Sequence, residues 1–172
     1  MGPSMISLRA ARDAADYAAF GNLCRAYVGW CRERYADIPW LVDEVFGYQS
    51  LDDELKVLSA KYGPPAGATW LAELDGVIVG GGAYRRLSDG ICELKRLYVA
   101  DAARGQGVGR RLTQALMDDA TAQGFTVMQL DTADRLSEAT ALYAAMGFVT
   151  CPPYHVYPDK LMPYIVFMQT PL

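Results

Sequence analysis

A glycine-rich turn between a predicted strand and a predicted helix constrains this 172-residue chain more than any other feature. The turn follows the apolar run Leu94–Val99 and reads Arg104-Gly105-Gln106-Gly107-Val108-Gly109-Arg110. Apolar residues then recur at helical spacing, which predicts an amphipathic helix: Val108, Leu112, Ala115, Leu116 and Ala120. Such a turn lets backbone N–H groups converge on an anion at the positive end of a helix, and glycine leaves the approach open. The turn therefore predicts a site for a phosphate or pyrophosphate.

The residues around this turn limit which phosphate ligand it would hold. The turn lacks the Gly-Lys-Ser/Thr ending with which nucleotide triphosphatases bind phosphates and magnesium. It reads G-x-G-x-G rather than the dinucleotide fingerprint G-x-G-x-x-G, and it lies past the middle of the chain instead of after a first strand. A nucleotide-binding protein is therefore the less favoured alternative.

The bulk composition is that of a folded chain. Hydrophobic residues make up 52% and charged residues 21%, which excludes disorder, and the length suits one domain over residues 1–172. We expect residues 1–4 to be a disordered tail or a cloning remnant, with Met5 as the native start. The sequence shows neither a signal-peptide pattern nor an apolar run of the roughly 20 residues that span a membrane. We therefore expect a cytoplasmic protein with no membrane partner.

The net charge and the cysteine content limit which ligands and partners the protein is expected to bind. The net charge of −4 argues against nucleic acid and favours a cationic or neutral acceptor. Four cysteines without a C-x-x-C pair, together with a single histidine, do not form an ordinary zinc constellation, so we expect free thiols and no metal. A homodimer is compatible with these data, although nothing in the sequence requires one.

Hydrophobic periodicity and turn signals predict a mixed α/β order. Helices are expected over Asp13–Arg34, from a capping box at Ser50-x-x-Asp53, after the glycine turn, and over Ser137–Met146, with a loop or short helix over Asp37–Tyr48. Strands are expected over Thr69–Leu74, Val77–Arg85, Ile91–Val99, Thr126–Leu130, Phe148–Cys151 and Leu161–Gln169. Asp75-Gly76 predicts a hairpin between the first two of these strands.

The pattern R-x-x-G-x-G, followed by Leu142-Tyr143-x-x-x-Gly147-Phe148, resembles the GNAT superfamily of N-acetyltransferases. The resemblance runs from about Trp70 to the C-terminus and is strongest over Glu93–Phe148. It implies the GNAT acyl-CoA N-acyltransferase fold, a mixed central sheet flanked by helices. It also implies acetyl-CoA as acyl-donor substrate, and transfer of the acetyl group to a primary amine of a small molecule or peptide.

The resemblance also implies which residues would hold the coenzyme. Backbone groups of the strand residues Leu97–Val99, directly before the turn, would pair with the pantetheine arm and polarise the thioester carbonyl. The turn amides, with Arg104 and Arg110, would hold the pyrophosphate. The implied coenzyme-binding residues are Leu97, Tyr98, Val99, Arg104, Gly105, Gln106, Gly107, Val108, Gly109 and Arg110. From the residues alone, Leu97, Tyr98 and Val99 are equally consistent with core positions, since the function would use their backbone.

Two residues are implied as catalytic. Glu93 lies six residues before Val99, where several GNAT enzymes carry a base that deprotonates the amine, and alternation places it on one strand face with Lys95, Leu97 and Val99. Tyr143 matches the family tyrosine that protonates the leaving thiolate. The alternatives are a strand-edge ion pair of Glu93 with Lys95 or Arg96, and a core position for Tyr143. His155 is a further candidate base or acceptor contact, with a surface loop as the favoured alternative.

The chain departs from the family pattern at two positions. Leu136 stands where many relatives have asparagine, and Asp101 stands where a proline is common. The detailed coenzyme contacts of the family are therefore less directly applicable to this chain. No cysteine lies in a recognisable nucleophile motif, so direct attack in a ternary complex is favoured over a covalent enzyme intermediate. The alternative is a non-catalytic acyl-CoA-binding or regulatory domain, which the presence of both Glu93 and Tyr143 disfavours.

Overall fold

A computed structural model describes residues 5–172, so the expectation for residues 1–4 lies outside the described residues. Its centre is a seven-stranded sheet with the order β1-β2-β3-β4-β5-β7-β6. The strands are β1 (Ile6–Ala10), β2 (Gly67–Leu74), β3 (Val77–Ser88), β4 (Ile91–Val99), β5 (Val127–Ala133), β6 (Val149–Thr150) and β7 (Ile165–Pro171). Of these seven strands in residues 5–172, β4 and β5 pair in parallel, and the other neighbours pair antiparallel. The expected mixed sheet flanked by helices is confirmed.

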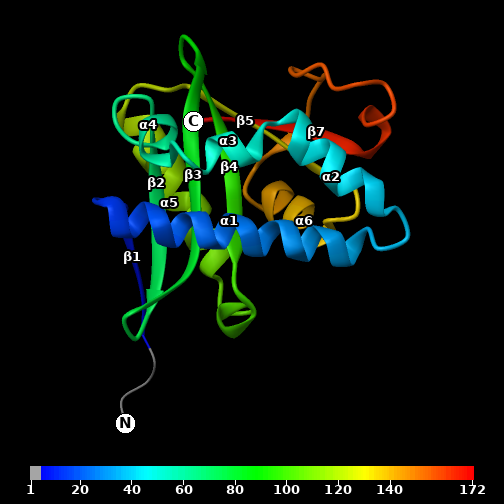
Figure 1. Cartoon of the computed structure of the whole chain (residues 1–172). Helices are drawn as coiled ribbons and strands as arrows, with labels where there is room; N and C mark the ends of the chain where they lie inside the picture. Colours follow the sequence, from blue (N-terminus) through cyan, green and yellow to red (C-terminus); the bar gives the residue numbers. More distant parts are fainter. Residues whose placement is uncertain (1–4) are drawn as a thin grey trace.

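Helices cover both faces of the sheet (Figure 1). They are α1 (Ala14–Arg34), α2 (Pro39–Tyr48), α3 (Leu51–Glu54), α4 (Leu58–Tyr62), α5 (Val108–Ala122) and α6 (Ser137–Ala145). Helix α1 lies across the front of β3 and β4, whereas α5 packs on the back of the same strands. No helix between residues 5 and 172 has both the length and the apolar character needed to cross a membrane.

A run of glycines on β3 lets the two long helices approach the sheet closely. A Cβ at Gly81 would lie 3.1–3.2 Å from side-chain carbons that include Leu23 and Phe20 of α1. A Cβ at Gly82 would lie 3.0 Å from Leu116 of α5 on the opposite face. Both contacts are tighter than ordinary van der Waals contact, so a larger residue at either position would push a helix away from the sheet.

Strands β4 and β5 pair over a short stretch and then separate. The parallel ladder joins Ile91, Cys92 and Glu93 to residues 127–129 and goes no further. Beyond it, β5 continues on β7 and β4 continues on β3. Among residues 5–172, the edge of β4 that faces β5 therefore has no strand partner from Leu94 to Val99. An unpaired strand edge offers backbone donors and acceptors to an extended ligand.

A β-bulge in β4 changes which side chains share a face. Arg96 has a φ of 60°, and two residues on β4 oppose one on β3 at this point. As a result, Tyr98 contacts the aromatic rings of α1 on the Glu93 side, whereas Leu97 packs in the cluster that contains Leu116 of α5. The expectation that Glu93 shares its face with Leu97 and Val99 is wrong, because the bulge interrupts the alternation.

Other differences from the predicted elements have local causes. Ser50 adopts a left-handed φ of 55° and caps nothing with its side chain, so the expected capping box is wrong, and two short helices, α3 and α4, replace one. Strand β1 was not predicted; it pairs with β2 at the sheet edge. Residues Met162–Tyr164 form a 3₁₀ turn before β7, so the last strand begins later than predicted.

Candidate active site

The glycine turn presents free backbone donors at the start of α5. Gly105 and Gly107 both have a φ of 74°, a conformation that L side chains rarely adopt. Within the described chain, no group accepts a hydrogen bond from the backbone N–H groups of residues 105–110. A Cβ at Gly107 would meet nothing within 4 Å, so the space in front of the turn is open. These N–H groups at a helix N-terminus suit an anionic ligand.

The predicted phosphate-binding arginines lie differently. The Arg104 Nε donates to the Val99 carbonyl oxygen at 2.9 Å, its Nη1 lies 2.7 Å from Asp101, and its guanidinium stacks over the Trp30 ring. Arg110 is exposed at the turn. Arg111 donates to the Ile6 carbonyl oxygen on β1, which removes it from the turn. Arg110 is therefore the arginine that is free to approach a phosphate on the turn.

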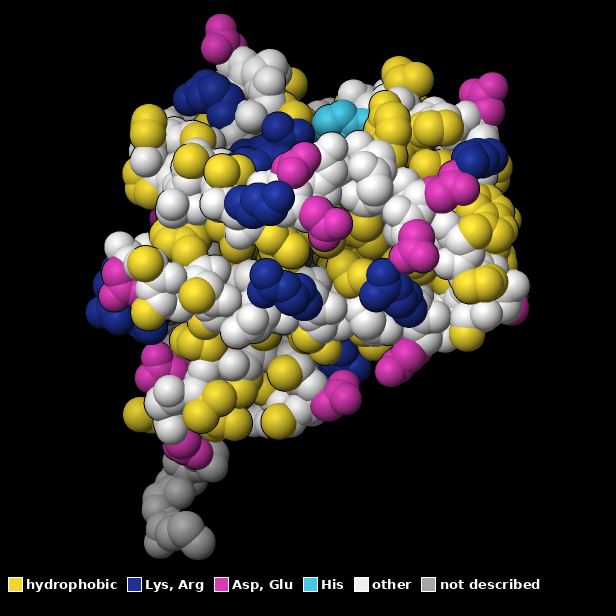
Figure 2. Space-filling view, viewed as in Figure 1, with side chains coloured by type: hydrophobic (Ala, Val, Ile, Leu, Met, Phe, Trp, Pro, Cys, Tyr) yellow, Lys and Arg dark blue, Asp and Glu magenta, His cyan; other side chains and the backbone are white. Residues whose placement is uncertain are grey.

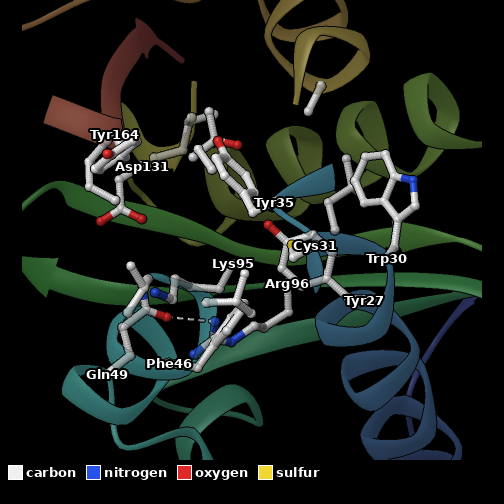
Figure 3. A pocket seen from close by; sticks show the side chains of 18 of the residues that line it. Tyr27, Trp30, Cys31, Tyr35, Phe46, Gln49, Lys95, Arg96, Asp131 and Tyr164 are labelled. Atoms are coloured by element: carbon white, nitrogen blue, oxygen red, sulfur yellow. Dashed lines mark hydrogen bonds between the residues drawn. The ribbon is translucent and has the colours of Figure 1, made fainter. Parts of the chain in front are cut away.

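A cavity fills the space where β4 and β5 separate (Figure 3). Its walls come from α1 and α2, from both strands and from α6, and its lining includes Tyr27, Trp30, Phe46, Lys95, Arg96, Leu97, Asp131 and Tyr143. The turn adjoins this cavity, since a Cβ at Gly109 would lie 3.3 Å from Leu142 of α6 and 3.9 Å from Val99 of β4. The structure thus brings the predicted coenzyme-binding turn, the end of β4 and α6 together.

Tyr143 reaches this cavity from α6. Only 7% of its surface is exposed, and its ring packs on Phe148 at 5.6 Å between ring centroids. Within the described chain, its hydroxyl has no hydrogen-bond partner. Burial raises the pKa of Tyr143 above its ordinary value, so the phenol stays protonated at neutral pH. A protonated, unpartnered hydroxyl at a cavity wall can donate to a ligand.

Glu93 is fully buried at the centre of a polar network. Its Oε2 accepts a hydrogen bond from the Tyr154 hydroxyl at 2.8 Å and lies 2.7 Å from the His155 Nε2. Its Oε1 lies 3.0 Å from the Arg85 guanidinium and 3.9 Å from the Lys95 ammonium. The predicted strand-edge pair with Lys95 or Arg96 is thus only one part of a larger set of contacts around Glu93.

These contacts determine the protonation state of Glu93. Burial alone would raise the pKa of this carboxyl, but Lys95, His155, Arg85 and Tyr154 outweigh burial and lower the pKa to about 2. Glu93 is therefore ionised at neutral pH. A carboxylate of such low basicity is a weak proton acceptor by itself, because efficient acid–base catalysis needs a pKa near the working pH.

His155 connects this buried network to solvent. Its side chain is 30% exposed, and Figure 2 shows the imidazole at the upper surface of the molecule. One ring nitrogen faces Glu93, which leaves the other for a ligand or water. Glu93, His155 and Asp131 place one ligand atom each within 4.8 Å of one another. This geometry could hold a cation, but Arg85 and Lys95 already compensate the charge of Glu93.

Sequence reasoning missed several members of this network. Asp131 on β5 accepts a hydrogen bond from the Tyr157 hydroxyl at 2.8 Å, and Tyr154 and Arg85 contact Glu93 directly. The available signal was the cluster of tyrosines and prolines in residues 152–158. Its position above Glu93 depends on the β5–β7 pairing, which the sequence does not specify.

The four cysteines are buried and free. Burial raises the pKa of the Cys24 and Cys92 thiols to about 12 and that of the cavity-lining Cys31 to about 11. A thiol with such a pKa carries little thiolate at neutral pH, and the thiolate is the nucleophilic form. None of these thiols therefore has the environment of a nucleophile.

Comparison with known proteins agrees with this geometry. A sequence profile of the acetyltransferase (GNAT) family matches residues 24–148. An uncharacterized N-acetyltransferase from Schizosaccharomyces pombe is 34% identical over 171 residues, covering 98% of this chain and 96% of that protein. An acetyltransferase from Streptococcus agalactiae shares the fold with a TM-score of 0.74 at 20% identity, over 97% of this chain and 98% of that chain.

A second solved structure shows the fold with a ligand. The PaiA N-acetyltransferase from Thermoplasma acidophilum, in complex with coenzyme A, matches with a TM-score of 0.73 at 16% identity, over 98% of this chain and 99% of that chain. The match of the family profile to most of the chain, together with the full-length relative, decides the assignment. This chain belongs to the GNAT acetyltransferase family and is an acetyl-CoA-dependent N-acetyltransferase.

Proposed function

We propose that this enzyme transfers the acetyl group of acetyl-CoA to a primary amine of a small molecule or peptide by direct attack in a ternary complex. The observation that carries the proposal is the gap between β4 and β5. It joins the free amides at the start of α5 to a cavity bounded by Tyr143 and the Glu93 network. A donor and an acceptor could therefore meet in this gap.

The donor would bind along the loop and the open strand edge. The amides of residues 105–110, with Arg110, would hold the pyrophosphate. The unpaired edge of β4 from Leu97 to Val99 would pair with the pantetheine arm, and a backbone N–H near the bulge would polarise the thioester carbonyl. Arg104 would have to leave Asp101 to contact a phosphate.

Proton transfer would use groups on either side of the thioester. Because the pKa of Glu93 is about 2, we assign the proton-accepting atom to the free nitrogen of His155, with the Glu93 carboxylate orienting the ring and stabilising its charged form. A water relay would connect this pair to the amine. Tyr143 would give its proton to the departing thiolate of coenzyme A. The amine nitrogen then forms the amide bond as the thioester C–S bond breaks.

The test is a thiol-release assay with purified enzyme and a panel of primary amines. When the concentrations of both substrates are varied, double-reciprocal plots of the initial rates should give intersecting lines, as expected when both substrates must bind before the chemical step. Incubation with labelled acetyl-CoA alone should leave the protein unlabelled. Parallel lines, or an acetylated cysteine isolated from that incubation, would contradict direct attack.

A further inference from the structure

Lys95 occupies a position that the acetyl transfer described above does not use. Its side chain is only 10% exposed and extends from β4. It lines the cavity between β4 and β5 and also a second hollow beneath His155, and the two cavities share Gln49, Lys95 and Arg96. Lys95 thus lies where a path from the surface near His155 meets the space between the strands.

The Lys95 ammonium has unused hydrogen-bonding capacity. Among residues 5–172, no oxygen accepts a hydrogen bond from its Nζ, and the Glu93 carboxylate at 3.9 Å is beyond hydrogen-bond distance. An ammonium carries three N–H donors. The neighbouring Arg96 donates through Nε to Glu54 at 2.9 Å and through Nη1 to Gln49 at 2.7 Å, and its Nη2 is a buried donor with no partner among residues 5–172. A nearly buried cation with free donors is costly unless water or a ligand supplies the acceptors.

The charges around Lys95 leave a place for an anion. The charged side chains of the two cavities and the Glu93 network comprise four cations and three carboxylates: Lys61, Arg85, Lys95, Arg96, Glu54, Glu93 and Asp131. Burial and the nearby Arg96 lower the pKa of Lys95, an effect that Glu93 and Asp131 only partly oppose. A ligand carboxylate would supply the charge that is missing here.

The other residues that line the cavity indicate which further groups the ligand carries. Asp131, Glu93 and His155 form an acidic and basic cluster that suits an amine, and Figure 3 shows Asp131 and Lys95 at the same end of the cavity. Another part of the lining is aromatic, with Tyr27 6.2 Å from Trp30 and 5.9 Å from Phe46 between ring centroids. Such a wall suits an apolar or aromatic group.

We propose, building on the acetyl transfer proposed above, that the acceptor is a free amino acid with an apolar or aromatic side chain. Its carboxylate binds the Lys95 ammonium, its amine faces Asp131 and the Glu93–His155 pair, and its side chain packs on Tyr27 and Phe46. An amide-capped acceptor or a peptide with a downstream amide would leave the Lys95 donors without an ionic partner, so the site discriminates against both.

The first test compares phenylalanine, phenylalaninamide and phenethylamine, which share the aromatic body and the amine. Because a hydrogen bond to a charged group contributes about 1.5–3 kcal/mol, kcat/KM for phenylalanine should exceed that for the other two by roughly 10- to 150-fold, mainly through KM. Lys95→Gln should remove this preference, and Lys95→Arg should keep part of it. Lys56→Gln is the matched control, because Lys56 is 76% exposed and its one ion pair among the described residues is with Asp53 at 3.7 Å.

The second test needs no turnover. Phenylpropanoate, which has the carboxylate but lacks the amine, should bind the coenzyme A-loaded wild type in calorimetry and bind Lys95→Gln at least tenfold more weakly. If it binds in this way while no amine is acetylated, the anion site stands and the proposed amine transfer fails. Equal rates for acid and amide, an equal loss for both in Lys95→Gln, or no binding of phenylpropanoate would each overturn the proposal and leave Lys95 as the counter-ion of Glu93.

Discussion

Replacing Glu93 with glutamine tests the buried network through its effect on stability. The pKa of Glu93 falls from 4.5 to about 2 on folding, and each pKa unit corresponds to about 1.4 kcal/mol, so the ionised carboxylate contributes about 3 kcal/mol at neutral pH. Since the folded-state pKa is the lower one, this contribution is complete above pH 4.5 and is lost as the pH falls toward 2. Glu93→Gln should therefore lower the free energy of unfolding by about 3 kcal/mol at pH 7.

The pH dependence separates this explanation from a simple packing defect. At pH 3.5 the unfolded carboxyl is largely protonated whereas the folded one is ionised, so the gap between wild type and Glu93→Gln should shrink by about 1.4 kcal/mol. Urea denaturation at both pH values measures the gap. Glu138→Gln is the control, because Glu138 is 59% exposed and its surface pair with Arg34 should contribute at most about 1 kcal/mol. A gap that is equal at both pH values would refute the electrostatic argument.

Three further outcomes are expected. Gly107→Val should weaken coenzyme A binding at least tenfold (about 1.4 kcal/mol) in calorimetry, because valine is strained at a φ of 74° and its side chain would crowd the loop amides. The control Gly76→Val, which also places valine at a positive φ but in the remote β2–β3 turn, should bind coenzyme A normally. Equal affinities in both variants would contradict the assignment of the loop to coenzyme binding. Tyr143→Phe should lower kcat about 10²–10⁴-fold with acetyl-CoA affinity unchanged, and a wild-type rate for the transfer step in rapid-mixing kinetics would argue against its role as acid. His155→Gln should lower turnover about 10²-fold or more at neutral pH, and turnover should partly recover at high pH because the free amine is more abundant there. An unchanged pH–rate profile would mean that another group is the base.

The parts of the fold that local signals determine were predicted well. The glycine turn, the Asp75-Gly76 hairpin and the long helix after Asp13 depend on residues close in sequence, and each lies where the pattern placed it. Strand β1 was missed because it is a five-residue edge strand whose Arg9 bonds to Asp16 and Glu73 rather than continuing an apolar pattern. Tertiary contacts, and not local propensity, form that strand.

The candidate site was predictable in its residues but not in its connections. The resemblance identified Glu93 and Tyr143, whose roles stay predictions, and periodicity could not show that His155 lies 2.7 Å from a carboxylate 62 residues earlier. Periodicity did not indicate the bulge at Arg96 either. A non-glycine residue at a φ of 60° costs about 1–3 kcal/mol, and the contacts that hold it there come from Gln49 and Glu54, more than 40 residues away.

That bulge explains how the single strand β4 contributes both to the Glu93 network and to the region of the glycine turn. Before it, Glu93 faces the network beneath His155; after it, Leu97 packs toward α5 and the glycine turn. With regular alternation, Leu97 and Val99 would share the Glu93 face, and Tyr98 would point away from the rings of α1 that it now contacts. The Arg96–Glu54 pair that holds the bulge also anchors the short helix α3, whose Glu54 lines the second hollow beneath His155. The geometry of β4 and the wall of this second hollow therefore depend on one buried ion pair, and a change at either partner would disturb both.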